Sequence, residues 1–212
     1  MNLNLFGYGG KWVIVDLGIT FAGPNLPGID LIFPDPSFIE ERRDSLMGIV
    51  LTHAHEDHFG ALPYLWPRLK CPVYATPFTA ELLRCKLEDA GLLGEVPIHE
   101  VSLGGEISLG PFDISFITLT HSILEPNGLA IKTPLGTVFH TGDWKIDPDP
   151  LLGEAADEEG MRAMGDGDIL AMICDSTNVF NDYESGSEAT VRESLRRIVA
   201  QQTGRVAVTA FA

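Results

Sequence analysis

The residues best suited to chemistry lie in one stretch of six, His53-Ala54-His55-Glu56-Asp57-His58, directly after the apolar run of residues 48–52. His53 and His55 are two positions apart, so in an extended segment both imidazoles point to the same side and can bind one ion. Asp57 and His58 follow where the chain should turn into a helix, which directs them towards a second ion. The stretch therefore predicts a metal site with two halves.

The ligand types narrow the choice of metal. Imidazole nitrogen and carboxylate oxygen without a thiolate favour zinc, with manganese or iron as alternatives. A solvated polar loop that happens to be rich in histidine is the competing interpretation. Clustered, unpaired imidazoles after a strand of buried type have little structural use, so we favour the metal site.

Two later segments carry further candidate ligands, each just past the end of an expected strand. His121 follows the strand of residues 113–118, and Asp143 follows the strand of residues 137–139. Either residue alone would be weak evidence. Their shared position at strand ends, together with the first cluster, strengthens both assignments.

Counting ligands divides the candidates between two ions. The first ion would receive three nitrogens and keep room for water, from His53, His55 and His121. The second ion would be held by Asp57 and His58, with Asp143 bridging both ions, and it remains one ligand short. Two ions about 3.5–4 Å apart can hold a hydroxide nucleophile and stabilise the leaving oxygen of a phosphoryl transfer.

Three other polar residues have less direct roles. His140, three residues before Asp143, is expected to anchor that loop by a hydrogen bond. His99 lies in an alternating segment and is expected to be an exposed strand residue. Asp16, at the end of the strand of residues 12–15, is either a turn residue or a partner that fixes a metal-bound imidazole.

The composition is that of a globular protein with a sizeable core, with 45% hydrophobic and 21% charged residues in a chain of 212. No apolar run approaches the ~20 residues of a membrane span, and no signal sequence opens the chain. The three cysteines, Cys71, Cys85 and Cys174, lack CxxC spacing and are expected to be buried free thiols in a reducing cytoplasm.

The formal net charge of −16 argues against a general nucleic-acid-binding surface, which normally needs a basic face. Two bound divalent ions would offset only part of this charge. The remaining acidic residues are concentrated at residues 147–149 and 154–159, which we expect to form a solvated loop.

The expected elements are strands in the first half of the chain, followed by alternating strand and helix. Strands are expected at residues 3–6, 12–15, 47–51, 73–75, 106–109, 113–118, 128–133, 137–139 and 169–174, and another over residues 205–211. Helices are expected at residues 59–66, 77–90 and 188–202, and residues 21–37 should form an irregular loop. This order predicts a sheet sandwich covered by helices.

The HxHxDH motif after a strand, the later lone histidine and the Thr-Gly-Asp aspartate resemble the metallo-β-lactamase superfamily. Within it the chain is similar to ribonuclease J of the β-CASP branch over nearly its whole length. The motifs that carry this similarity are Gly28–Asp30, Leu51–Tyr64, Thr120–Ile123, His140–Asp147, Asp175–Asn178 and Ser187-Glu188. HxHxDH alone specifies only the superfamily, whereas the TGDWKID and DSTN…SE blocks favour the ribonuclease J family.

The resemblance implies a mixed α/β fold, the αββα sandwich, incomplete in this chain. It also implies a cytoplasmic enzyme, a homodimer or tetramer when complete, that uses zinc or manganese. Such an enzyme cleaves single-stranded RNA with a 5′-monophosphate, in the 5′-to-3′ exonucleolytic and sometimes the endonucleolytic mode. The implied metal ligands are His53, His55, Asp57, His58, His121 and Asp143. Of these, Asp57, His58 and Asp143 would be catalytic, and Asp16 and His140 would support the site.

The resemblance also implies a domain boundary. Residues 1–208 would form the first segment of the lactamase domain, and residues 209–212 would begin a β-CASP domain. A later part of the family's chain supplies the last histidine ligand, the phosphate-binding residues and much of the RNA channel. A small-molecule hydrolase of the same fold, such as a lactonase or thioesterase, and an inactive fragment stay open as alternatives.

Overall fold

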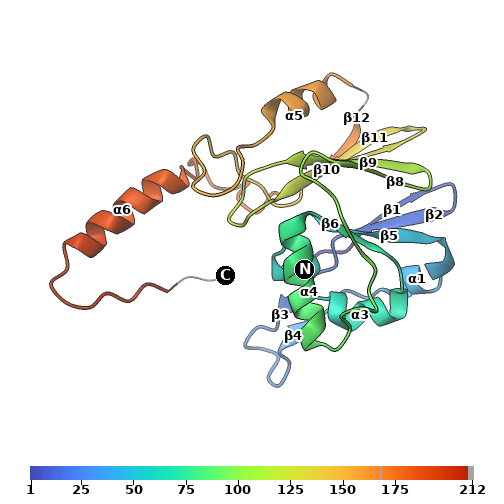
Figure 1. Cartoon of the computed structure of the whole chain (residues 1–212), viewed down its shortest axis with the longest axis horizontal. Coiled ribbons are helices and arrows are strands. Elements are labelled where there is room, and N and C mark those ends of the chain that lie inside the picture. Colours follow the sequence, from blue (N-terminus) through green and yellow to red (C-terminus); the bar gives the residue numbers. More distant parts are fainter. Residues whose placement is uncertain (168, 210–212) are drawn as a thin grey trace.

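Two five-stranded β-sheets face each other in a computed structural model that describes residues 1–167 and 169–209 (Figure 1). The first sheet contains, in spatial order, β1 (Asn4–Tyr8), β2 (Lys11–Val15), β5 (Leu46–Val50), β6 (Val73–Ala75) and β7 (Ile98–Glu100). The second contains β12 (Ile169–Ile173), β11 (Gly136–His140), β10 (Asn127–Thr133), β9 (Phe112–Thr118) and β8 (Glu106–Leu109). A short pair, β3 (Thr20–Phe21) and β4 (Leu31–Ile32), lies in the loop after β2.

Strand direction explains where the helices lie. β1 and β2 form an antiparallel hairpin, but β2, β5, β6 and β7 are parallel, and parallel neighbours need crossover connections. The crossovers contain α1 (Ser37–Glu40), α2 (Glu56–Phe59), α3 (Leu62–Leu69) and α4 (Pro77–Asp89) and a 3₁₀ turn (Arg43–Ser45). Figure 1 shows α1, α3 and α4 on the face of the first sheet that points away from the second. The second sheet is antiparallel except for β12, which runs parallel to β11.

The first sheet separates two buried apolar layers. Alternation along β2 sends Val13 and Val15 into the layer between the sheets and Ile14 into the layer under the helices. Phe112 and Phe116 of β9 fill the first of these layers from the opposite sheet. The fold is therefore the expected sandwich, with helices over the outer face of its first sheet.

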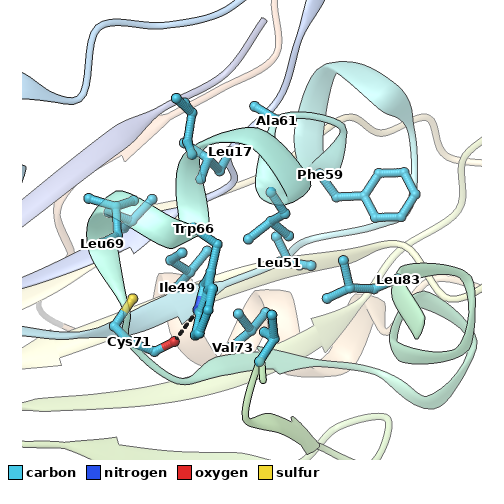
Figure 2. Packing of buried hydrophobic residues seen from close by; sticks show 14 of the residues in the cluster. Leu17, Ile49, Leu51, Phe59, Ala61, Trp66, Leu69, Cys71, Val73 and Leu83 are labelled. Carbon is cyan, nitrogen blue, oxygen red and sulfur yellow. Dashed lines mark hydrogen bonds between the residues drawn. The ribbon is translucent and has the colours of Figure 1, made fainter. Parts of the chain in front are cut away.

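The helix-side layer is organised around Trp66 of α3, which Figure 2 shows beside Ile49 and Val73 of the sheet. The Trp66 indole N–H donates a hydrogen bond of 2.7 Å to the backbone oxygen of Cys71. A buried indole needs such an acceptor, because an unpaired N–H in an apolar layer is costly. This layer holds α3, and thereby the chain that follows the histidine cluster, against the sheet.

The expected strands up to residue 140 are confirmed, with shifts of one or two residues at their ends. The helix after the cluster differs from the expectation, because it is divided into α2 and α3 and continues through Pro67 to Leu69. Pro67 lacks one backbone hydrogen bond, but it lies in the last turn, while Leu62, Trp66 and Leu69 bury the apolar side of the helix.

The acidic segment is only partly a solvated loop. Asp147 is buried, which corrects the expectation for residues 147–149. Its carboxylate accepts hydrogen bonds from Lys145 Nζ (3.2 Å) and from the backbone N–H groups of Asp149 (3.0 Å) and Glu188 (2.9 Å). These donors replace water, and they hold the pKa of Asp147 well below its usual range. Part of the second acidic run forms the start of α5 (Glu158–Gly165).

The C-terminal elements lie apart from the two apolar layers. Helix α6 (Glu188–Ala200) is capped by Ser187, whose hydroxyl accepts from the backbone N–H of Ala189. Its apolar residues Val191, Leu195, Ile198 and Val199 are exposed, and Figure 1 shows the helix projecting from the sheets. The strand expected from residue 205 is absent over residues 205–209. Residues 210–212, and with them most of the expected second domain, lie outside the described residues.

The three cysteines are free thiols, as expected, but only Cys71 is buried, and the expectation was wrong for Cys85 and Cys174. Within the described residues, every helix is too short or too polar to cross a lipid bilayer.

Candidate metal centre

The site begins where the parallel strands β2 and β5 end side by side. Asp16 follows β2 with a φ of 61°, a left-handed conformation that aspartate tolerates better than most residues. Its carboxylate accepts hydrogen bonds from the backbone N–H of Thr52 (2.8 Å) and from the Thr52 hydroxyl (2.9 Å). Asp16 therefore fixes the start of the loop that carries the histidine cluster.

Three imidazoles converge beyond this point, from His53, His55 and His121. His53 Nε2 lies 3.0 Å from His55 Nδ1, and the His121 ring centroid lies 5.2 Å and 4.9 Å from those of His53 and His55. One nitrogen from each ring lies within 4.8 Å of the other two. Nitrogens bound to one tetrahedral zinc ion are roughly 3.3 Å apart, so this three-histidine group has the composition and approximate spacing of a metal site.

A second group consists of His53, His58 and Asp143, whose ligand atoms also lie within 4.8 Å of one another. His58 Nε2 is 3.2 Å from Asp143 Oδ1 and 3.4 Å from Asp57 Oδ2. The other Asp143 oxygen lies 3.8 Å from His121 Nε2. Asp143 therefore faces both groups, with one oxygen towards each.

Hydrogen bonds at the opposite ring nitrogens decide which atoms could bind metal. The Thr52 hydroxyl donates to Asp16, so it accepts from His53 Nδ1, which is 3.0 Å away. His58 Nδ1 lies 2.7 Å from Asp16 Oδ2 and donates to that carboxylate. Both rings then carry a proton on Nδ1 and direct Nε2 into the site. Histidines that bind metals commonly show this arrangement, in which the other ring nitrogen donates to an oxygen atom.

The three-histidine group holds its imidazoles in the neutral form. Burial lowers the pKa of His53 well below its usual value, and the neighbouring imidazoles act in the same direction. Burial also lowers the pKa of His55 and the pKa of His121, although both side chains are partly exposed. Neutral imidazoles have a free lone pair, which is the form that binds a metal.

The second group is instead a network of opposite charges. Burial opposes the charged form of His58, but the carboxylates of Asp16, Asp143 and Asp57 outweigh it and raise the His58 pKa to about 12. The hydrogen bond from His58 lowers the pKa of Asp57 to about 2. Burial raises the pKa of Asp143, yet the contact with His58 outweighs this and leaves it below its usual value.

Two glycines permit the close approach of the segments that carry these residues. A Cβ on Gly18 would lie 1.7 Å from the backbone oxygen of Asp57, so the chain after Asp16 can pass this close to α2 only with glycine. Gly142 has a φ of 58°, and a Cβ there would lie 3.0 Å from the Thr52 Cβ. Glycine at this position brings the Asp143 loop against the start of the histidine loop.

Two cavities flank the centre. A polar cavity of about 290 Å³ lies beside the second group and is lined by residues that include Asn2, Asp57, His58, Asp143 and Asp175. A more apolar cavity of about 260 Å³ borders the three-histidine group, and His121 forms part of its wall with Leu119, Ile123 and Leu124. The side chains of Asp57 and Asp143 are 46% and 30% exposed, so the second group is open to a ligand.

The structure brings the six predicted ligands to one place, but it divides them differently. His53 belongs to both groups, and its ring lies 4.0 Å from that of His58. Asp57 lies beside the second group without being one of its three members. The loop-anchoring hydrogen bond expected of His140 is present, since His140 Nδ1 accepts from the Gly142 N–H (3.0 Å). His99 is exposed on β7 and stacks on Tyr74, away from the centre.

Sequence reasoning missed two residues that contact the ligands. Thr52 links Asp16 to His53, and its position directly after a strand gave a weak signal for such a role. Asn2 has its side-chain nitrogen 3.1 Å from His58 Nε2, and nothing in the local sequence indicated this contact.

Comparison with known proteins agrees with this geometry. Residues 11–165 match a family model described as a beta-lactamase superfamily domain. Over the whole chain, the sequence is 50% identical to ribonuclease J of Sinorhizobium meliloti and 36% identical to ribonuclease J of Thermus thermophilus. The chain spans about 38% of the length of each of these curated relatives.

A solved structure shows the same fold at low sequence identity. It is a protein of unknown function from Enterococcus faecalis, with a TM-score of 0.64 and 15% identity, and the match covers 94% of this chain and 54% of that one. The family model covers most of both sheets and the segments that carry the histidine cluster, His121 and Asp143, and the chain belongs to the β-lactamase superfamily.

Proposed function

We propose that the protein is a metal-dependent ribonuclease that hydrolyses phosphodiester bonds of RNA. The observation that carries this proposal is the pair of ligand groups sharing His53, with Asp143 between them, in a chain 50% identical to a ribonuclease J. Nitrogen and carboxylate donors without a thiolate fit two divalent ions, zinc by preference and manganese as the alternative. His53, His55 and His121 would hold one ion, and Asp57, His58 and Asp143 would hold the other.

Two divalent ions would supply an acidified water and neutralise charge on the phosphate. The residues of the chain have complementary tasks. Asp16 and Thr52 hold the His58 and His53 rings with Nε2 towards the site. Asp143, with an oxygen facing each group, can accept a hydrogen bond from the attacking water and orient it. Asp57, His58 and Asp143 are therefore the residues that we assign to catalysis.

The charge of the chain supports a role for cations in binding RNA. The formal net charge is −16, and the polar cavity beside the second group is lined by Asp57, Asp143 and Asp175. These carboxylates repel a phosphodiester unless cations lie between them. The chain spans only part of its relatives, so we further propose that basic RNA-binding surface comes from outside residues 1–208, in a β-CASP domain that begins at residues 209–212.

The finer assignments follow the ribonuclease J relatives. We propose single-stranded RNA with a 5′-monophosphate as substrate, cleaved 5′-to-3′ exonucleolytically and also endonucleolytically. We also propose a cytoplasmic location and a homodimer or tetramer.

The test is degradation of a 5′-monophosphorylated, single-stranded RNA by a protein of the relatives' length that carries this chain, loaded with zinc or manganese. We expect mononucleotide products from the 5′ end and a slower reaction on the 5′-triphosphorylated form. The matched control is Asp143→Asn, which keeps the shape of the side chain and removes its charge. Intact RNA at all metal concentrations would contradict the proposal, and hydrolysis of a lactone or thioester instead would favour a small-molecule hydrolase.

A further inference from the structure

The side-chain amide of Asn2 lies close to both residues of α2 that we assign to the second ion, Asp57 and His58. Its Nδ2 donates a hydrogen bond of 3.0 Å to the backbone oxygen of Asp57. The same nitrogen lies 3.4 Å from Asp57 Oδ2 and 3.1 Å from His58 Nε2, the nitrogen that faces Asp143. Asn2 therefore approaches the second group from a segment that supplies no metal ligand.

The backbone of Asn2 is fixed from both sides. Its N–H donates to the backbone oxygen of Asp57 (2.9 Å), and its own oxygen accepts from the N–H of Gly18 (2.9 Å). Residues 17 and 19 donate to the backbone oxygens of His58 and Glu56 in the same way. The short helix α2 thus lies against Asn2 and the segment of residues 17–19. Backbone N–H groups of these residues donate hydrogen bonds to the carbonyl oxygens of residues 56–58 in α2.

The hydrogen-bond partners fix the orientation of the Asn2 amide. The opposite orientation would bring the amide oxygen to the carbonyl oxygen of Asp57, and two acceptors at this distance repel each other. The amide nitrogen must therefore face α2, where its two N–H groups point at the Asp57 carbonyl and the region between Asp57 Oδ2 and His58 Nε2. In this orientation Asn2 acts as a donor and not as a metal ligand.

We propose that Asn2 is a positioning residue that holds the Asp57 carboxylate towards the second metal ion through the donor contacts of its amide with Asp57. This inference rests on the proposed metal centre. Carboxylate ligands of metals are commonly oriented by hydrogen bonds from a second layer of residues, and loss of such a partner typically weakens metal binding about 10–100-fold. Asp57 needs such a partner more than His58 does, because its side chain is 46% exposed and Asp16 already orients His58.

The experiment is a zinc titration of the 212-residue chain and its Asn2→Leu variant against a chromophoric chelator, with zinc per chain measured by elemental analysis. Leucine keeps the branched shape and removes the donor. We expect the affinity for the second ion to fall about 10–100-fold while the affinity for the first ion is unchanged. Cobalt(II) gives a second readout, since the visible absorption of the second equivalent should weaken or shift when its ligands are misdirected.

The matched control is Asn4→Leu, because Asn4 lies in β1 and lines the same cavity, while within the described residues its side chain has no hydrogen bond to Asp57 or His58. Equal affinities for the second ion in the two variants would overturn the inference. Asn2→Ala carries the same expectation and replaces Asn2→Leu if that variant does not fold. A parent chain that binds no second ion would instead refute the proposed centre itself, and the two failures are therefore distinguishable.

Discussion

The two ligand groups share His53 but differ in charge. The three-histidine group consists of neutral imidazoles whose pKa values are lowered by burial. In the second group, His58 is held as a cation by three carboxylates, which raise its pKa to about 12. A cation can therefore enter the first group directly, whereas it must displace a proton from the second. For the proposed pair of ions, we therefore expect the first to bind before the second.

The cavities beside the two groups also differ, because one is polar and the other has an apolar wall. The second group opens to a polar cavity with several carboxylates, and His121 of the first group borders a cavity with an apolar wall. The charged group is thus the more accessible to a polar reactant. The differences in charge and exposure lead to three predictions that separate the groups, and a fourth prediction tests the link between them.

The largest expected effect is the loss of one ion in His55→Ala. His55 contributes only to the three-histidine group, and two histidines alone make a weak zinc site. Elemental analysis after dialysis should give one metal ion fewer per chain than in the parent protein. His99→Ala is the control, because His99 is exposed on β7 and stacks on Tyr74. An unchanged stoichiometry in His55→Ala would remove His55 from the ligand set.

A selective effect on the second group is expected from Asp16→Asn. Asp16 accepts the Nδ1 proton of His58, and an amide nitrogen in its place would force the opposite tautomer, with the proton on Nε2. We expect about 10–100-fold weaker binding of the second ion and little change in the first. Zinc titrations of both proteins measure this difference. Asp113→Asn, at an exposed position of β9, is the control, and equal losses at both sites would show that Asp16 acts only through folding.

The pH dependence of metal binding should also separate the groups. The His58 pKa is raised to about 12, so between about pH 7 and about pH 9 a proton must leave as the second ion binds. The affinity for the second ion should therefore rise by up to about tenfold per pH unit. The lowered pKa values of His53, His55 and His121 mean that no proton competes for the first ion in this range.

Calorimetry in buffers of different ionisation enthalpy measures the protons released with each ion. We expect about one proton with the second ion and none with the first. Equal release at both steps would mean that the two groups do not differ in charge as the raised His58 pKa and the lowered pKa values of the other histidines indicate.

The convergence of the candidate ligands could be predicted from the sequence because their positions obey a local rule. Each ligand segment follows an apolar strand, and strands that end at the same edge of a sandwich bring the residues after them together. The histidine cluster, His121 and Asp143 all satisfy this rule. The hydrogen bond of His140 to its own loop could be predicted as well, since it depends on only three consecutive residues.

Contacts between distant segments could not be predicted in this way. The shared position of His53 depends on the tilt of its ring towards His58, which the spacing of the motif does not determine. Asn2 reaches the site across 55 residues of sequence, and Asp147 is buried because Lys145 and the N-terminus of α6 surround it. The apolar residues Val191, Leu195, Ile198 and Val199 recur at helical spacing, but spacing alone does not determine that they are exposed on α6.

The smallest expected effect belongs to Thr52→Val, which tests the link between the groups. The Thr52 hydroxyl donates to Asp16, accepts from His53 Nδ1 and lies 3.4 Å from His58 Nδ1, so it contacts the supports of both groups. Valine keeps the shape and removes these bonds, each worth about 0.5–1.5 kcal/mol. Titration should therefore give a loss of about two- to tenfold for both ions together. A loss confined to one ion would mean that the groups, although they share His53, are held in place independently.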